Sequence, residues 1–497
     1  LFTYPHLFIL IYLSSFIYPH LFILIYLFFL DSKSFVDLKL KVPEEELLVE
    51  FDALKERSNG TLSKDQISQF VQDHFEQGRE LESWAPPDFT ENPSILKKNR
   101  DSQYRVWAQE LNMIWRTLAR KVKEDVREHP DLYSQIYLPN GLVVPGGRFK
   151  EIYYWDTYWI VYGLLVCDMH DTARGMIENL LSLVARFGYV PNGSRKYYFM
   201  RSQPPLLIPM ADAYLRFNQT QGMKLIEDYF EVTHFTTRSK GPRPESYKED
   251  YELAEHFPEQ WQRDVFYNQI KTAAETGWDF SSRHINKDGT NEGNLTNTLT
   301  ESIVQVDLNA LLEQNILWNE EEGIWFDYDL LYKKQRKYFY ASNFAPLWTK
   351  SYRRSRVEVG DLAVQYLSRN GLIDPFWMPQ FWGMPMSLLN TTQQWDYPNM
   401  WAPLQSFFIF GLDQTDSTMA QRVAKRFAAN YAQTNFVGYK KTGKMFEKYS
   451  AIHEGESGNG GEYEVQEGFG WSNGVIFQIL EKYGQVLMSP NNEIDGS

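Results

Sequence analysis

The feature that most restricts the fold is a helical periodicity that recurs from residue 31 onward and alternates with long loops. In 101–126, apolar and aromatic residues recur at helical spacing and predict an amphipathic helix. Segments 171–187, 413–432 and 471–483 predict further helices, whereas alternating patterns typical of strands are scarce. This rhythm of helix, long loop and helix predicts an all-α toroid of helical hairpins, an (α/α) barrel with its loops gathered at one end.

The long loops are rich in Gly, Pro, Asn and aromatic residues. Compact domains seldom keep loops of this length unless the loops carry function, so we expect the functional site in them. Nothing in the pattern indicates a second domain, and 31–490 is expected to form one domain followed by a tail, 491–497. The loops are 138–156, 188–207, 239–248, 276–285, 383–403 and 439–474.

Residues 1–30 form an anomalous hydrophobic leader. Residues 2–13 (FTYPHLFILIYL) recur almost unchanged as 16–27 (FIYPHLFILIYL), and no basic residue precedes Lys33. The leader has the apolar stretch of a secretion signal but not its basic start, and a Pro-His pair interrupts the run of about 20 apolar residues that a membrane anchor needs. Three interpretations stay open, namely a misassigned gene end, a degraded signal and a membrane anchor.

Composition excludes several classes of protein. A net charge of −14 argues against nucleic-acid binding, which needs a basic face. The single cysteine, Cys167, excludes an internal disulfide and a cysteine-based metal cage. The nine histidines form no HExxH pattern, and P-loop, GxGxxG and GxSxG motifs are absent, so we predict neither metal nor cofactor. Carboxylates acting as acid and base remain the favoured chemistry.

The first loop, PGGRFKEIYYWDTY (145–158), combines two cations, several rings and two carboxylates. Such a mixture suits a sugar, because polar groups bind hydroxyls while a ring covers the apolar face. The alternative is a cation–π and ion-pair cluster that merely closes the loop. The candidates are Arg148, Phe149, Tyr153, Trp155 and Asp156.

The next two loops hold polar side chains between prolines and glycines. They contain Asn192-Gly-Ser, Arg201-Ser-Gln-Pro-Pro and Gly241-Pro-Arg-Pro-Glu-Ser-Tyr. Rigidly held polar groups lose little entropy when they bind a ligand. Ordinary turn chemistry is the alternative for each motif alone.

The fourth loop, GWDFSSR, places Asp279 between two aromatic rings. Burial beside apolar rings raises the pKa of a carboxylic acid, which is the condition for a general acid that keeps its proton near neutrality. Asp279 is therefore the best acid candidate. The alternatives are an ion pair with Arg283 or a helix cap.

The last two loops add further acidic groups beside tryptophan and tandem glycines. QWDYPNMWAP ends at Pro403, MFEKY carries Glu447, and GGEYEVQEGFGW carries Glu462. Glycines before the acidic groups could let this loop close over a ligand. Spacing alone does not separate Glu447 from Glu462.

Taken together and in order, these motifs resemble the trehalase family, glycoside hydrolase family 37. PGGRFKEIYYWD resembles its first signature and QWDYPNMWAP its second, and the similarity extends from about residue 31 to residue 483. The resemblance implies an (α/α)6 catalytic barrel that hydrolyses α,α-trehalose to two glucose molecules with inversion. Inversion implies acid and base carboxyl groups roughly 6.5–9.5 Å apart, with room for a water molecule between them.

The resemblance also implies roles for single residues. Asp279 is expected to be the general acid, Glu447 the general base, and Glu462 a substrate contact. Three arginines around the sugar are expected to help keep the base ionised. The family positions that grip the two glucose units are Arg148, Trp155, Asp156, Asn192, Arg201, Ser202, Gln203, Arg243, Pro244, Glu245 and Gly277.

The sequence departs from the family pattern in three places. Met400 stands where a small residue is usual, 218–243 is short, and a helical pair is missing around 312–316. The barrel is therefore expected to lack part of one hairpin. A catalytically dead sugar-binding remnant and a glucoamylase-like exo-glucosidase on the same type of barrel are the alternative functions.

The expected location is extracellular or membrane-associated, with a cytoplasmic location left open. Glycosylation sequons at Asn59, Asn218, Asn294 and Asn390 fit a secreted glycoprotein, but the same pattern occurs at Asn192 in the expected site. No hydrophobic C-terminal tail offers a lipid anchor. The only expected partner is the disaccharide substrate, and the sequence predicts no oligomeric state.

Overall fold

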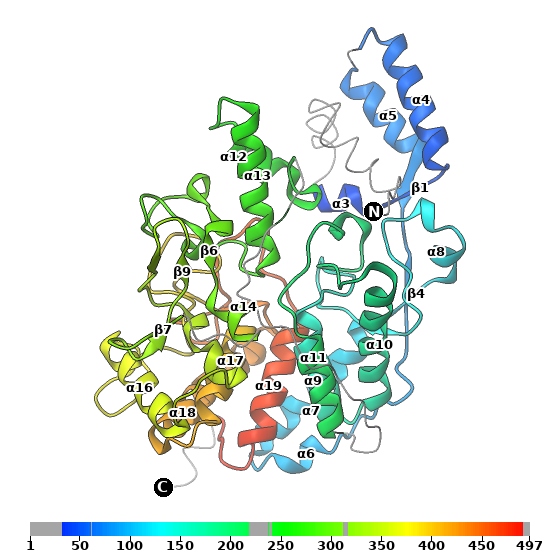
Figure 1. Ribbon diagram of the computed structural model, residues 1–497. Coiled ribbons are helices and arrows are strands. Elements are labelled where there is room, and N and C mark those ends of the chain that lie inside the picture. Colours follow the sequence, from blue (N-terminus) through cyan, green and yellow to red (C-terminus); the bar gives the residue numbers. More distant parts are fainter. Residues whose placement is uncertain (1–31, 61, 218–236, 238–240, 312–316, 491–497) are drawn as a thin grey trace.

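The computed structural model describes residues 32–60, 62–217, 237, 241–311 and 317–490. Helices dominate this part of the chain (Figure 1). The α-helices are α3 (Ser32–Val36), α4 (Glu44–Arg57), α5 (Lys64–His74), α6 (Ile95–Lys98), α7 (Ser102–Leu118), α8 (Glu124–Glu128), α9 (Asp156–Val166), α10 (His170–Phe187), α11 (Leu207–Phe217), α12 (Tyr247–Ala254), α13 (Gln260–Glu275), α14 (Val306–Leu311), α15 (Ala345–Thr349), α16 (Arg356–Arg369), α17 (Ala402–Asp413), α18 (Thr418–Thr442) and α19 (Gly470–Tyr483).

Short 3-10 helices and strands lie between the α-helices. The strands pair antiparallel in the orders β1–β2, β3–β4–β5, β6–β9–β10, β7–β8 and β11–β12. The 3-10 helices are η1 (Pro130–Leu132), η2 (Lys196–Tyr198), η3 (Pro244–Ser246), η4 (Ser282–His284), η5 (Leu295–Asn297), η6 (Thr300–Ser302) and η7 (Ala341–Phe344). The strands are β1 (Leu38–Leu40), β2 (Phe75–Gln77), β3 (Leu81–Ser83), β4 (Ala119–Val122), β5 (Leu142–Val143), β6 (Ile303–Val304), β7 (Trp318–Asn319), β8 (Ile324–Trp325), β9 (Tyr328–Asp329), β10 (Lys334–Gln335), β11 (Asn399–Trp401) and β12 (Lys448–Ser450).

Three helices with little polar surface, α9, α17 and α19, form the inner part of the fold. In α9 every residue except Tyr162 is buried, and α17 and α19 are buried almost throughout. A helix that is apolar on all sides is stable only where other elements surround it. Their sequences therefore require an outer layer of helices.

Helices α9 and α19 approach each other closely because glycines face the contact. A Cβ atom at Gly474 would lie 2.1 Å from the Trp159 carbonyl oxygen, and one at Gly163 would lie 3.1 Å from the Gly474 Cα. Only glycine leaves room for this backbone contact. The contact brings together the helices that follow the first and the last site loops.

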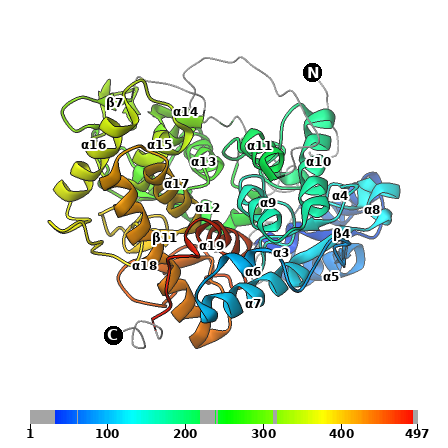
Figure 2. The same ribbon diagram turned by 90° about the horizontal axis from the view of Figure 1, so that it is seen from below.

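The outer layer consists of amphipathic helices, including α7, α10, α16 and α18. Figure 2 shows them around α9, α17 and α19. Helix α7 turns one stripe inward, and its Trp115 stacks on Phe477 of α19 with ring centroids 6.0 Å apart. This two-layered toroid confirms the all-α barrel of helical hairpins that the sequence predicts.

Two predicted helix boundaries are wrong. The helix expected over 101–126 ends at Leu118, because the chain then extends as β4 and pairs with β3 and β5. The helix expected over 413–432 is the end of α17 followed by a new helix, α18, whose N-terminus is capped by the Ser417 side chain and which continues to Thr442.

The inner helices begin at one end of the toroid, directly after the long loops. Trp155, Trp401 and Phe469 immediately precede α9, α17 and α19, and all three line the cavity described below. The loops are therefore gathered at this end, as expected.

A smaller N-terminal unit stands beside the same end. Helices α4 and α5 project away from the toroid (Figure 1) and bury Leu47, Phe51 and Ile67 between them. This small core continues inward through Phe35 of α3 to the ring of Tyr198. The N-terminal unit is thus joined to residues of the candidate site.

Several expectations fall wholly or largely outside the described residues. These are the leader, 1–30, the tail, 491–497, the missing helical pair at 312–316, and most of the short stretch 218–243. Among the residues that the structure describes, no helix is long and apolar enough to cross a membrane.

The unusual Met400 is fully buried. Its sulfur occupies the space beside Gly383, where a Cβ atom would lie 2.5 Å away. A glycine at 383 therefore accommodates the larger side chain at 400.

Candidate active site

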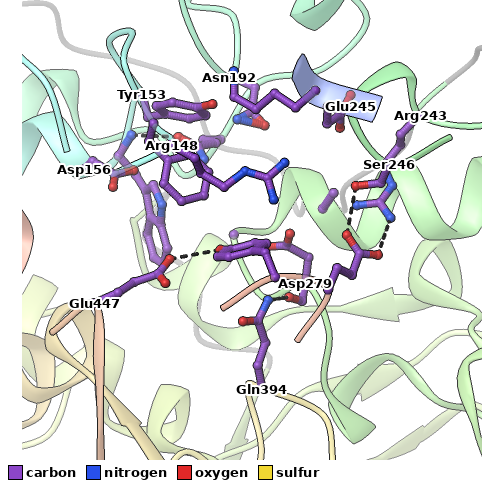
Figure 3. Close-up of a pocket in the computed structure, with 18 of the residues that line it drawn as sticks. Arg148, Tyr153, Asp156, Asn192, Arg243, Glu245, Ser246, Asp279, Gln394 and Glu447 are labelled. Carbon is purple, nitrogen blue, oxygen red and sulfur yellow. Dashed lines mark hydrogen bonds and ion pairs between the residues drawn. The ribbon is translucent and has the colours of Figure 1, made fainter. Parts of the chain in front are cut away.

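A cavity lies among the loops at the inner-helix N-termini (Figure 3). It encloses about 900 Å³, including the part open to solvent. Carboxylates, arginines and aromatic rings share its wall, which is the mixture expected for a sugar. The lining residues are Lys33, Arg148, Phe149, Tyr153, Trp155, Asp156, Asn192, Tyr198, Arg201, Gln203, Arg243, Glu245, Ser246, Glu249, Ala274, Gly277, Asp279, Gln394, Trp395, Trp401, Glu447, Glu462, Tyr463, Phe469 and Trp471.

The structure brings nearly all of the predicted site residues together. Only Ser202 and Pro244 are not among the lining residues of the described chain. Ser202 points behind the wall, where its backbone N–H donates to Glu275 (3.0 Å) and its hydroxyl donates to the Val190 carbonyl (2.7 Å). Pro244 is buried as the first residue of η3.

Some lining residues were not predicted individually. Several of them lie within the loop motifs identified in the sequence, so those motifs could have indicated them as site residues. Lys33 carried no signal, because it comes from α3 and reaches the site only through the fold. The other unpredicted residues are Tyr198, Ser246, Glu249, Ala274, Gln394, Trp395, Trp401, Tyr463, Phe469 and Trp471.

Asp279 is a half-buried acid in the loop after α13. Burial raises its pKa to about 7, Glu462 adds to the rise, and Arg243 and Arg201 oppose it. The suggested ion pair with Arg283 is not formed, because Arg283 binds Asp307 and Asp327, each at 2.8 Å.

The wall beside Asp279 consists of closely packed rings. Gly277 has a φ of +80°, and a Cβ atom there would lie 2.9 Å from the Trp155 ring. The neighbouring Trp278 stacks on Trp395 with centroids 5.3 Å apart. This packing fixes the chain immediately before Asp279.

Glu447 is a buried carboxylate that neutral groups hold. Its Oε1 accepts from the Tyr463 hydroxyl (2.9 Å), and its Oε2 accepts from the Gln466 backbone N–H (3.3 Å). Burial raises the pKa of Glu447, and the cations that oppose this rise are Lys448 and Arg148. Of the three arginines expected to keep the base ionised, Arg148 opposes the rise at Glu447, while Arg243 and Arg201 oppose the rise at Asp279.

Glu462 differs from Glu447 in being ion-paired. Its Oε1 accepts from Arg243 (2.8 Å) and its Oε2 from the Ser246 hydroxyl (2.8 Å). Arg243 also forms a two-pronged ion pair with Asp250, at 2.7 and 3.0 Å. Both carboxylate oxygens of Glu462 are thus engaged with donors on the cavity wall (Figure 3).

The remaining polar groups of the wall hold one another. Arg201 pairs with Glu245 (2.5 Å) and donates to the Asn192 side chain (3.0 Å). Gln203 accepts from the Trp155 backbone N–H (3.1 Å). These contacts fix the groups before any ligand arrives, which lowers the ordering cost of binding.

Arg148 and Asp156 complete the first loop's contribution. The Arg148 guanidinium lies 4.8 Å from the centroid of Tyr463, so the cation–π contact suggested as an alternative is present, and it lies on the cavity wall. Asp156 is the first residue of α9, and burial raises its pKa well above the usual range, with Glu447 and Asp279 adding to the rise.

Four tryptophans form a closed ring at the base of the cavity. Trp395 stacks on Trp401 with centroids 4.1 Å apart, and Trp471 lies edge-on to Trp401 at 5.6 Å. Trp155 contacts both Trp471 (5.7 Å) and Trp395 (5.8 Å). The ring gives the cavity a rigid aromatic floor.

A buried charge network supports the part of the cavity wall that contains Tyr153. Lys33 donates to Glu151 (2.7 Å), Asp37 (2.9 Å) and the Tyr197 hydroxyl (3.0 Å). Glu151 also accepts from Tyr153 at 2.7 Å. Because an ammonium group has three N–H donors, Lys33 has none left for a ligand.

Possible metal ligands lie elsewhere. Within the described ranges, the histidine and carboxylate group that could hold an ion is Asp125, Glu128 and His129, near the surface on α8 and at its C-terminal end. Asp125 is already hydrogen-bonded to Tyr133, Lys39 and His129. None of the three lines the cavity.

A helical barrel whose end loops surround buried carboxyl groups, arginines and stacked indoles defines the class of glycoside hydrolases with a toroidal helical fold. Within that class, the chain belongs to the trehalase family. The Trehalase family model matches residues 27–234, 218–316 and 313–484.

Curated relatives agree over most of their length. The chain is 41% identical to the trehalase of Pimpla hypochondriaca over 523 residues, covering 93% of the chain and 88% of that protein. It is 42% identical to the trehalase of Apis mellifera, covering 92% and 82%, and 39% identical to that of Homo sapiens, covering 92% and 87%.

A solved structure shares the fold. The neutral trehalase Nth1 from Saccharomyces cerevisiae superimposes with a TM-score of 0.50 at 19% identity, covering 69% of this chain and 73% of that one. This likeness supports the barrel architecture.

Proposed function

We propose that this protein hydrolyses α,α-trehalose to two glucose molecules with inversion at one anomeric carbon. The observation that carries the proposal is a pair of carboxyl groups, the half-buried Asp279 and the buried Glu447, on the wall of a sugar-sized cavity in a chain of the trehalase family. Their environments differ as the two roles require.

Asp279 acts as the general acid. With its pKa raised to about 7, a large share of the side chain carries a proton at neutral pH. This proton passes to the glycosidic oxygen while the bond between that oxygen and the anomeric carbon breaks. The first glucose leaves with its α configuration unchanged.

Glu447 acts as the general base on the other side of the sugar. It removes a proton from a water molecule, whose oxygen forms the new bond to the anomeric carbon from the face opposite the departing oxygen. The second glucose is released in the β configuration. The Tyr463 hydroxyl and the Gln466 N–H orient the carboxylate for this step.

The other lining residues bind the two glucose units. Glu462, held by Arg243 and Ser246, serves as a substrate contact, and the arginines and amides bind hydroxyl groups. The closed ring of four tryptophans covers an apolar face of the sugar. Ser202 and Pro244 support this wall from behind.

Catalysis is favoured over a dead sugar-binding remnant because the acid Asp279 and the base Glu447 are both present and both line the cavity. A glucoamylase-like activity is distinguished by its substrate.

The test is proton NMR of the purified full chain with trehalose. We expect α- and β-glucose in equal initial amounts, and no glucose from maltose. Asp279→Asn serves as the inactive control. Release of α-glucose alone would indicate retention, and glucose from maltose but not trehalose would indicate the glucoamylase-like alternative.

We also propose an extracellular or membrane-associated location. The sequon asparagines Asn59, Asn294 and Asn390 are exposed, whereas Asn192 is buried in the cavity wall. Glycans are therefore expected on the exposed sites and not at Asn192. Peptide mass spectrometry of the protein from secreting eukaryotic cells, with and without glycosidase, checks this, and a glycan at Asn192 would contradict it.

A further inference from the structure

One buried cation, Lys448, contacts several segments of the candidate site without lining the cavity. It follows Glu447 directly as the first residue of β12, opposite Trp401 of β11. Its ammonium group donates to the Gln394 side-chain oxygen (2.8 Å) and to the Gly460 carbonyl (2.8 Å). It lies 5.0 Å from the centroid of the Trp401 ring.

The two hydrogen bonds of Lys448 lead to segments that carry carboxyl groups of the site. Gln394 links Lys448 to the acid, because the Gln394 side-chain N–H donates a hydrogen bond to the Asp279 backbone carbonyl (Figure 3). Gly460 precedes Glu462 by two residues in the same loop. Glu447 is the sequence neighbour of Lys448, so one ammonium group joins the segments that carry all three carboxyl groups.

We propose that Lys448 is a positioning residue for the hydrolysis, which fixes the acid Asp279 through Gln394, and the loop of Glu462 through the Gly460 carbonyl, relative to the adjacent base Glu447. This inference rests on the proposed function. Lys448 does not touch the sugar, so its effect passes through these groups.

The chemistry of the side chain fits this role. An ammonium group donates several hydrogen bonds in different directions and so binds oxygens of two loops at once, which an apolar side chain cannot do. A buried charge also acts over several ångströms in a medium of low polarity. Burial lowers the pKa of Lys448 to about 8, while Glu447 and Asp279 oppose that fall, so its charge and theirs are coupled.

The first measurement compares steady-state kinetics of the full chain and of Lys448→Met. We expect kcat to fall at least tenfold while KM changes less than threefold, because the sugar contacts remain. Lys448→Arg keeps the charge and the donors and should recover part of kcat. Lys441→Met, an exposed lysine at the end of α18, is the matched control and should match the unsubstituted chain.

The second measurement separates positioning from a loss of folded protein. Among the described residues, the charged or titratable groups that contact or act on Glu447 include Lys448, Arg148, Tyr463 and Asp156. Removing the Lys448 charge should move the acid limb of the kcat profile to higher pH, since the carboxylate loses a stabilising cation. A merely structural role would lower the amplitude without moving that limb, and Lys448→Arg should leave it in place.

A double substitution tests the route through Gln394. If Lys448 acts on Asp279 through this amide, Lys448→Met should cost much less in a Gln394→Leu background than in the unsubstituted chain. Equal losses in both backgrounds, or an unmoved acid limb, would overturn the inference. If Lys448→Met does not fold, Lys448→Gln is measured in the same way. If the unsubstituted chain itself does not turn over trehalose, the proposed function fails. If only the Lys448 variants behave otherwise than expected, the inference about Lys448 fails alone.

Discussion

At the scale of single residues, the chemistry of the site depends on how differently three carboxyl groups are held. Asp279 is half-buried between the buried residues Trp278 and Phe280, Glu447 accepts from neutral donors, and Glu462 is paired with Arg243. We expect Asp279→Asn and Glu447→Gln each to lower kcat about 10²–10⁴-fold, the range for loss of a general acid or base. Glu462→Gln should instead raise KM about tenfold, or ~1.4 kcal/mol of binding. Initial-rate kinetics check this, with circular dichroism as the folding control; a larger kcat loss at Glu462 than at Glu447 would reverse the base assignment.

The pH profile of kcat/KM follows from the same pair. The reaction needs Asp279 protonated and Glu447 ionised. Because the pKa of Asp279 is raised to about 7, activity should fall as the pH rises above this value. Because burial also raises the pKa of Glu447, the acid limb should lie above the usual glutamate range, giving a bell centred on the acidic side of neutrality. Rates from pH 3 to pH 9 check this, and full activity at pH 9 would contradict the acid's role.

Local sequence predicts a residue's role when its environment is made by its neighbours in the chain. Asp279 could be identified because adjacent aromatic residues in GWDFSSR already indicate burial. Glu447 and Glu462 could not be separated in this way, since their difference depends on Arg243 and Tyr463 from other segments. Lys33 left no local signal at all.

At the scale of elements, the short helix α3 is expected to stabilise the site wall. Lys33 holds Glu151 and Asp37, which also contact Arg195. Lys33→Met would leave these carboxylates without one of their cations, at a cost of about 3–5 kcal/mol. We expect a lower unfolding midpoint in urea and a higher KM, because Glu151 supports Tyr153 of the cavity wall. Lys33→Arg should restore part of both, whereas an unchanged KM would show that the network does not reach the site.

The contact between α9 and α19 makes a second prediction at this scale. A methyl group at Gly474 would overlap the Trp159 carbonyl, so Gly474→Ala should destabilise the barrel by about 1–3 kcal/mol. Thermal unfolding followed by circular dichroism measures this. Ser368→Ala, an exposed change on α16, is the control, and equal midpoints for the two variants would contradict close packing at this contact.

Periodicity predicted the existence of the elements better than their ends. Residues 119–126 continue the apolar spacing of α7, yet 119–122 form β4 because β3 and β5 offer backbone partners that a single sequence does not reveal. The break between α17 and α18 has a local cause in Ser417, which is a strong helix cap.

At the scale of the whole molecule, the barrel could be predicted because its helices and loops differ so clearly in composition. The place of the N-terminal unit could not, since its small core meets the site tyrosines only in the folded chain. The buried inner helices thus stabilise the fold, and the loops at their N-termini form the cavity that binds the substrate.

The ring formed by Trp155, Trp395, Trp401 and Trp471 has a consequence for observing the protein. Indoles packed this closely share excitation energy, and all four line the cavity. A sugar that binds against any one of them is expected to alter the fluorescence emission of the group. The molecule therefore contains its own optical probe, with which occupancy of the cavity can be followed in real time without any attached dye.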